Sequence, residues 1–289
     1  MSTTYILQNV RVTLISLLAL FLALGTGCQS QYKCVSTGDV SRVKRVLEAE
    51  KDIGKRKECT RRLLSSASGR GHIEVVAFLL KNEIGVNELE EWATIALFGA
   101  ARRGHSEVVK LLLANGADVN RCSLMPSSWI RPERTPLYQA TANGHKEMVK
   151  LLLDNGADVN KKCEDGESAL LRSLRDRKME IAEMLLSYGA DINDKNNGRR
   201  TALHMAVALD RAEMVRYLLS KGADANAEIG LGCTPLHTAA YCNNVENAQI
   251  LLDHGADVTM RCDGRTALQI AESDKFRDLL QQHSASRKR

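Results

Sequence analysis

Apolar residues recur along most of the chain in pairs of short runs, each with the spacing of an α-helix. The segment 234–258 shows both runs. Its first run consists of Leu236, Ala239 and Ala240. Its second run, with apolar residues three and four apart, consists of Val245, Ala248, Leu251 and Leu252. Neither predicted helix is long enough to bury its apolar face alone, so successive helix pairs must stack on one another.

The turn between the two runs recurs with a fixed period. Before the middle of the chain it falls at Gly38, Gly71 and Gly104, with a spacing of 33 residues. The next turn follows after 40 residues, and the period of 33 then returns at Gly144, Arg177, Asp210 and Asn243. The seven extra residues lie in "RCSLMPSSWIRPER", residues 121–134. We interpret them as an insertion within one repeat array and not as a domain boundary. Arg177 and Asp210 replace glycine and are expected to strain their turns.

The repeated segments resemble ankyrin repeats. The motifs that carry the resemblance are "TPLH" at 234–237, "TALH" at 201–204 and the Gly-His segment at 104–120. The resemblance implies an all-α solenoid of stacked helix-loop-helix units with hairpin loops. It predicts about seven to eight units over residues 28–282, including a degenerate first unit at 36–50 and a short last unit at 264–280. A basic C-terminal tail, 283–289, would follow.

The N-terminal 27 residues have the pattern of a secretory signal peptide. An apolar run, 12–24, follows Arg11 and precedes small residues. The run is shorter than the roughly 20 residues that span a bilayer. The alternative is a retained membrane helix that extends back towards Ile6 and buries Gln8, Asn9 and Arg11.

The segment Gly25–Cys28 resembles the lipobox of bacterial lipoproteins. The resemblance implies lipidation of Cys28 and a membrane-anchored protein of the bacterial cell envelope. Gln29 is not the Asp that retains such lipoproteins at the inner membrane, which favours the outer membrane. Gly25 departs from the family, which usually has Leu there. The alternative is ordinary cleavage, with Cys28 a free thiol and the protein secreted.

The sequence contains no recognisable reaction centre, so we expect no enzyme, metal, cofactor or small-molecule substrate. Five histidines recur with the repeat period, and we interpret them as hydrogen-bonding residues that connect neighbouring units: His72, His105, His145, His204 and His237. The net charge of +5 over 289 residues is too small to indicate a nucleic-acid partner by itself. Aromatic residues make up only 4% of the chain, which predicts thin layers of Leu, Val, Ala and Ile.

The cysteines are expected to be mainly free thiols. Four of them fall in loops between units: Cys122, Cys163, Cys233 and Cys262. Stacked helices lie about 10 Å apart, whereas a disulfide requires Cα atoms about 4.4–6.8 Å apart. Pairing of Cys122 with Cys163, or of Cys233 with Cys262, would therefore require loop movement. Free thiols would be unusual in an exported protein.

The insertion is a candidate protein-binding element. Its prolines, Pro126 and Pro132, limit the entropy that is lost on binding. Trp and Arg are enriched among the residues that dominate interface energies. The candidate partner-binding residues are Trp92, Trp129, Ile130, Arg131 and Arg134. The alternative is that Trp129 folds back and covers apolar surface of the neighbouring unit.

A second charged segment, 51–62, is rich in Lys and Arg and contains only Asp52 and Glu58 as acidic residues. It is either a solvated loop or a surface that is attracted to anionic lipid headgroups. The sequence as a whole predicts a membrane-tethered scaffold that binds a protein partner through its concave face and an extended hairpin loop. The alternative is an exported effector or inhibitor that binds a target protein without a lipid anchor.

Overall fold

The computed structural model describes residues 36–82, 89–122, 134–163 and 166–286. It divides into two compact parts at the start of the insertion, where the sequence led us to expect continuity. The N-terminal part ends at Arg121 and the C-terminal part begins at Cys122. The described residues form helices and loops, with isolated bridges between Ile229 and Cys233 and between Cys262 and Arg265. No helix among them is long and apolar enough to span a bilayer.

Each repeat consists of a first and a second helix that run back along one another. The N-terminal part contains α2 (Val40–Ala49), α3 (Ile53–Arg70), α4 (Ile73–Asn82), α5 (Leu89–Arg103) and α6 (Ser106–Ala114). The first helices α3 and α5 are longer than any first helix of the C-terminal part, and they pack closely against each other. Among the described residues, the degenerate first unit contributes its second helix, α2.

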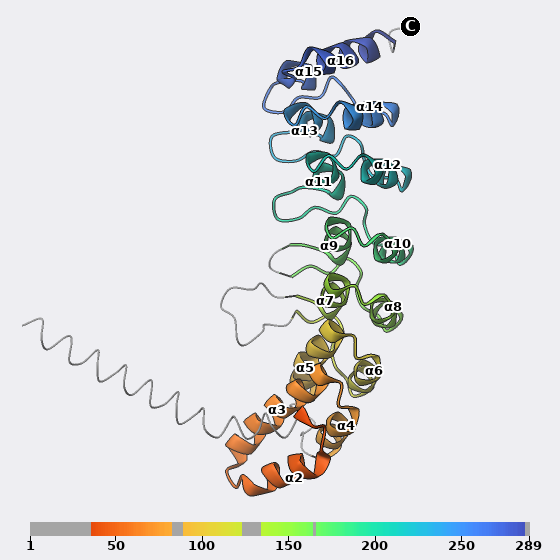
Figure 1. Ribbon diagram of the computed structural model, residues 1–289. Coiled ribbons are helices and arrows are strands. Elements are labelled where there is room, and N and C mark those ends of the chain that lie inside the picture. The colour runs from red at the N-terminus through yellow and green to blue at the C-terminus, as the bar shows by residue number, and fades with distance from the viewer. Residues whose placement is uncertain (1–35, 83–88, 123–133, 164–165, 287–289) are drawn as a thin grey trace, which may run out of the picture. The chain divides into compact units, whose positions relative to one another are not determined.

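The C-terminal part contains five helix pairs. Its first helices are α7 (Pro136–Asn143), α9 (Ala169–Arg175), α11 (Ala202–Ala208), α13 (Pro235–Tyr241) and α15 (Ala267–Ile270). Its second helices are α8 (Lys146–Asp154), α10 (Met179–Ser187), α12 (Ala212–Ser220), α14 (Val245–Asp253) and α16 (Asp274–Ser286). Figure 1 shows the first helices in one row and the second helices in another. The predicted all-α solenoid is confirmed.

The helix boundaries follow from short local signals. First helices of the C-terminal part begin at Ser or Thr N-caps, and the side chains of Thr135, Ser168 and Thr201 accept hydrogen bonds from backbone N–H groups of the first turn. The turn to the second helix needs a left-handed residue, which is supplied by Gly144 with φ 77°. Arg177 and Asp210 adopt the same conformation with φ 59° and 50°. These two non-glycine residues therefore hold strained backbone, as the sequence predicted.

Asparagine side chains connect the loops of successive repeats. Asn160 accepts a hydrogen bond from the backbone N–H of Asp191 and donates to the carbonyl of Gly189. Asn226 repeats both bonds two hairpin loops later, with Asp257 and Gly255. Each repeat is thereby fixed to the next through backbone groups that would otherwise face water.

Two disulfides join adjacent loops in the C-terminal part, so the expectation of mainly free thiols is wrong for these four cysteines. Cys122 pairs with Cys163 and Cys233 with Cys262, with Cα atoms 5.9 Å and 4.3 Å apart. The prediction used the spacing of helix axes, but the loops approach more closely than the helices do. The backbone N–H of Asp263, for example, donates a 3.1 Å hydrogen bond to the carbonyl of Leu231 in the preceding hairpin loop. Cys242 is an exposed free thiol.

Two further expectations require correction. The basic segment 51–62 is not a loop, because α3 begins at Ile53 and runs through it. The C-terminal tail does not begin at residue 283, because α16 continues to Ser286.

Candidate protein-binding face of the C-terminal part

The exposed positions of the first helices form a continuous candidate face. In each first helix most side chains are buried between neighbours, and the partly exposed positions recur every 33 residues. We define the first-helix face as these positions in α7, α9, α11 and α13, together with the polar groups that contact them. One end of the face is charged and the other is apolar.

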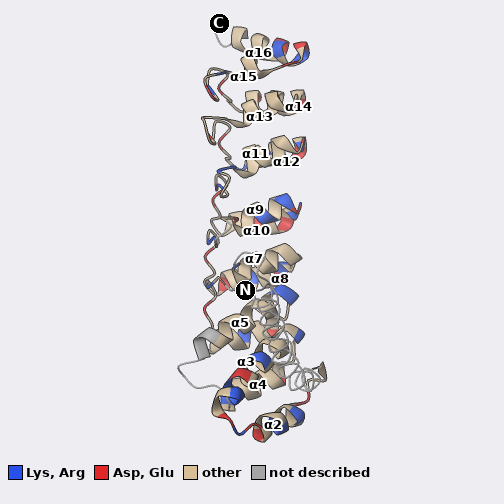
Figure 2. Cartoon of the chain, turned by 90° about the vertical axis from the view of Figure 1, so that its left-hand side faces the viewer, with Lys and Arg blue, Asp and Glu red and all other residues tan. Residues whose placement is uncertain are grey.

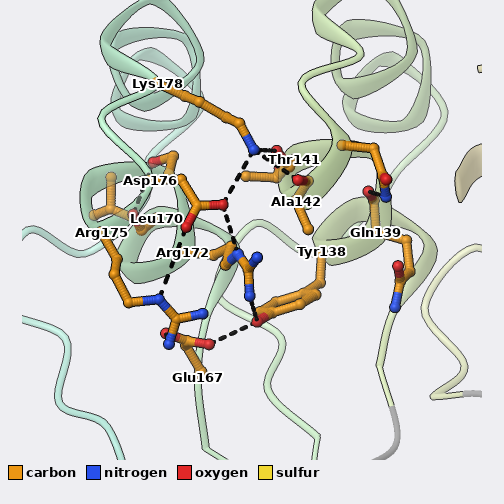
Figure 3. Close-up of polar contacts among 12 residues, drawn as sticks. Tyr138, Gln139, Thr141, Ala142, Glu167, Leu170, Arg172, Arg175, Asp176 and Lys178 are labelled. Atoms are coloured by element: carbon orange, nitrogen blue, oxygen red, sulfur yellow. Dashed lines mark hydrogen bonds and ion pairs between the residues drawn. The ribbon is translucent and has the colours of Figure 1, made fainter.

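The charged end is a network of hydrogen bonds and ion pairs centred on Tyr138 and Asp176 (Figure 3). The Tyr138 hydroxyl donates to Glu167 at 2.6 Å and accepts from Arg172 at 3.1 Å. Arg172 also donates to Asp176 at 2.8 Å. Arg175 pairs with Glu167 at 2.7 Å. The network therefore links α7, the hairpin loop that precedes α9, and α9 itself.

Lys178 closes the network from the turn that follows α9. Its ammonium group contacts Asp176 at 3.1 Å and donates to the carbonyls of Thr141 and Ala142 at the end of α7. Burial alone would raise the pKa of Asp176, but hydrogen bonds from Lys178 and Arg172 outweigh burial and lower it. Asp176 is thus held as a carboxylate, and the guanidinium groups around it are held in fixed positions.

Tyr138 is the centre of the cation–π contacts on this face. The guanidinium carbon of Arg134 lies 4.2 Å from the centre of the Tyr138 ring, and that of Arg172 lies 5.6 Å from it. Burial, and then the hydrogen bond to Glu167, raises the pKa of the Tyr138 hydroxyl. Burial lowers the pKa of Arg134. Arg134, at the end of the segment 121–134, is therefore packed onto this network.

The apolar end of the face continues from the charged end. Arg175, Met205 and Leu209 line one shallow hollow between α9 and α11. Leu209 is 53% exposed, and Tyr241 of α13 is 57% exposed. The Tyr241 hydroxyl accepts a 3.2 Å hydrogen bond from Arg265. Large exposed apolar side chains beside fixed guanidinium groups are typical of protein-binding surfaces.

The predicted partner-binding residues have different outcomes. Trp92 lies inside α5 and is only 8% exposed. Trp92 is therefore a packing residue, and the prediction that it offers a binding surface is not carried further. Arg134 is half-buried against Tyr138. Trp129, Ile130, Arg131 and the predicted lipidation site Cys28 lie outside the described residues.

Sequence reasoning missed the residues of the charged network. Tyr138 stands where two other repeats have the histidines of their Thr-x-Leu-His motifs, and Arg172 stands where the next repeats have Met205 and Thr238. A position-by-position comparison of the repeats would have revealed these departures. The contacts themselves could not be found in this way, because Glu167 belongs to a loop that has no helical pattern.

The periodic histidines connect neighbouring repeats, as predicted for His105, His204 and His237. The ring Nε2 of each lies near a backbone carbonyl of another repeat, at 3.2 Å from Gly69, 3.3 Å from Cys233 and 3.1 Å from Met260. In His237, Nδ1 accepts a hydrogen bond from the backbone N–H of Thr234. With Nδ1 accepting and Nε2 donating, the neutral ring satisfies both contacts, and protonation would break one of them.

Acid is expected to destabilise the C-terminal part through His204. Burial lowers the pKa of His204 to about 4 from its ordinary value of 6.5. The unfolded chain therefore binds this proton first as the pH falls. The stabilisation is complete above pH 6.5 and is lost between pH 6.5 and 4, with a loss of about 2 kcal/mol already at pH 5. We expect urea denaturation at pH 7 and pH 5 to show this loss, and His204→Asn to show a correspondingly smaller pH dependence. An equal pH dependence in the variant would contradict this role of His204.

The described residues contain no group of three or more His, Cys, Asp or Glu side chains that could hold a metal ion. The paired short helices, hairpin loops and exposed first-helix face instead define a helical repeat solenoid. The chain belongs to the ankyrin-repeat family. The family model "Ankyrin repeats (3 copies)" matches residues 32–123, 137–229 and 203–285, and "Ankyrin repeats (many copies)" matches 97–153.

Solved ankyrin-repeat structures are similar to the chain over most of its length. The ankyrin repeat domain of Bcl-3, a member of the IkappaB family, is 26% identical with a TM-score of 0.65, covering 75% of this chain and 97% of that one. The ankyrin repeat domain of human ASB11 is 28% identical with a TM-score of 0.56, covering 76% and 96%. A search of curated proteins found no match. Ankyrin-repeat domains mediate protein–protein interaction, and the fold is typically a non-enzymatic scaffold.

Proposed function

We propose that the protein is a scaffold of the bacterial cell envelope that binds a protein partner through the first-helix face. The observation that carries this proposal is the combination of exposed Leu209 and Tyr241 with an adjoining, preassembled charged network. Because hydrogen bonds already hold Arg172 and its neighbours, little side-chain entropy is lost when a partner binds. The insertion, including Trp129, Ile130 and Arg131, would extend this face beyond Arg134.

We propose further that export precedes function and that Cys28 carries a lipid anchor, with the outer membrane favoured. The apolar run 12–24 and the lipobox-like Gly25–Cys28 support this proposal. The two disulfides also support it, because disulfides persist in oxidising compartments such as the periplasm and are rare in the cytosol. The alternative is an exported effector or inhibitor that acts without an acyl chain.

The binding proposal is tested by crosslinked capture of the partner from the producing cells. Leu209→Glu combined with Tyr241→Glu places two charges at the apolar end of the face. The matched control, Ser220→Glu with Gln249→Glu, places two charges at exposed positions of second helices. We expect the first variant to bind the captured partner about 10–100-fold more weakly, as for loss of two interface contacts worth about 1 kcal/mol each, and the control to bind normally. Equal binding by both variants would refute the first-helix face as the docking site.

The anchor is tested separately by labelling cells with a palmitate analogue. We expect the wild-type protein to be labelled and recovered with membranes, and Cys28→Ser to be unlabelled and recovered in the soluble fraction. An unlabelled wild-type protein in the culture medium would favour the exported effector. This result would leave the binding proposal intact, since the labelling experiment tests Cys28 and the capture experiment tests the first-helix face.

A further inference from the structure

The positive charge of the chain is concentrated at one end of the N-terminal part. Residues 42–62, which cover most of α2 and the first half of α3, contain nine basic and four acidic side chains. Their excess of five positive charges equals the net charge of the whole 289-residue chain. Figure 2 shows Lys and Arg in blue on both helices. The remaining residues together therefore have no net charge.

The acidic side chains in and beside this segment are engaged locally. Glu58 pairs with Arg61 and Arg62 at 2.7 and 2.6 Å. The carboxylate of Asp52 caps α3 by accepting the backbone N–H of Lys55. In contrast, the exposed ammonium groups of Lys51 and Lys55 make no ion pair with any described residue. Residues 51–57 contain four basic side chains and one acidic side chain, an excess of three positive charges at the start of α3.

An exposed aliphatic side chain lies within this basic segment. Ile53, the first residue of α3, is 74% exposed, and every residue from 51 to 55 is exposed. The first turn of α3 therefore projects beyond the helices against which its later turns pack. The buried positions of the helix begin only at Cys59 and Thr60. Exposure of this branched aliphatic side chain to water, between Lys51 and Lys55, is energetically unfavourable.

We propose that the start of α3, with Lys51, Ile53, Lys55 and Lys57, docks on an anionic lipid bilayer. The lysines would lie against acidic headgroups, and Ile53 would enter the boundary between headgroups and acyl chains. The surface does not suit a nucleic acid as well. Residues 40–70 contain no aromatic side chain on which a base could stack, and an aliphatic residue at the centre of this basic segment would face phosphates. The proposal does not depend on acylation of Cys28, since the contact is made by folded residues.

The proposal is tested with the full Cys28→Ser chain and vesicles of phosphatidylcholine, with or without 30% phosphatidylglycerol. The ratio of binding to the two vesicles isolates the charge-dependent contact from any effect of the apolar run 12–24. We expect Lys51→Gln/Lys55→Gln/Lys57→Gln to lower this ratio about 100-fold, since each basic group near an anionic surface contributes roughly fivefold. The matched control, Lys81→Gln/Lys150→Gln/Lys275→Gln, removes the same charge at exposed positions elsewhere. We expect it to lower the ratio less than threefold.

Ile53→Ser distinguishes lipid from other anions. We expect this variant to bind phosphatidylglycerol vesicles about tenfold more weakly and to bind single-stranded RNA unchanged. Equal losses for the two lysine triples would overturn the proposal, because net charge alone would then explain binding. Tight RNA binding together with unchanged binding of Ile53→Ser to phosphatidylglycerol vesicles would overturn it in favour of a nucleic-acid surface. All substituted side chains are exposed, and circular dichroism verifies that the helices are retained.

Discussion

Replacing Cys122 and Cys163 with serine is expected to lower the free energy of unfolding of the C-terminal part by about 4 kcal/mol. The pair encloses 41 residues, which include the insertion and the first helix pair of this part. The unfolded chain gains the freedom that the crosslink removed, whereas the helices of the folded chain are unchanged. Cys233 and Cys262, separated by 29 residues, are expected to contribute about as much, since loop entropy grows only slowly with length.

Urea denaturation measures this effect in the wild type and in each double variant, with and without a reductant. The reductant is expected to destabilise the wild type to the level of a variant that lacks both pairs, and to leave that variant unchanged. Cys242→Ser is the matched control because Cys242 is an exposed free thiol. A wild-type midpoint that is insensitive to the reductant would show that the two bonds do not form in the protein.

The disulfides also bear on binding, because they fix hairpin loops that border the first-helix face. The Cys122–Cys163 bond joins the residue that precedes the insertion to the next hairpin loop. The second bond fixes the loop that carries Leu231, whose side chain is 70% exposed. A loop that is fixed before binding loses less entropy when a partner binds. An oxidising compartment would therefore give the scaffold both stability and a preformed binding surface.

The helical repeat could be predicted from the sequence because its signals are local. Apolar spacing places the helices, and Ser or Thr caps such as Ser168 begin them. The turn residue is equally local, and Asn243 adopts the left-handed conformation with φ 53°. Because each repeat contacts mainly its neighbours, correct local assignment was almost sufficient for the whole architecture.

The candidate face could not be predicted in the same way, because it depends on distances between loops. Nothing in the sequence around Glu167 indicates that its carboxylate reaches both Tyr138 and Arg175. The prediction of free thiols failed for the same reason, since the spacing of helices does not set the spacing of hairpin loops. The prediction that Trp92 lies on a binding surface failed because α5 begins earlier than the first helices of other repeats and includes Trp92. The structure therefore adds most to the sequence-based prediction at positions that depart from the repeat pattern.

Phe276→Ala is expected to destabilise the last repeat by about 4 kcal/mol, the usual cost of removing a fully buried phenylalanine. Phe276 lies in α16 and has no exposed surface. The helix α15 has only four residues, so α16 supplies most of the apolar contact that this repeat makes with α14. Within the described residues, this repeat packs against one neighbour, the α13–α14 pair. Its loss of packing therefore cannot be compensated from the other side.

The expected effect is local, and amide hydrogen exchange distinguishes it from global unfolding. In Phe276→Ala, amides of residues 267–286 should exchange faster, whereas those of α11 and α12 should keep their protection. Phe276→Leu is the matched control, since it retains most of the buried volume and should lose only about 1 kcal/mol. Uniform acceleration across the C-terminal part would contradict the prediction. It would mean that the five helix pairs unfold as one unit, so that the first-helix face depends on the packing of the last repeat.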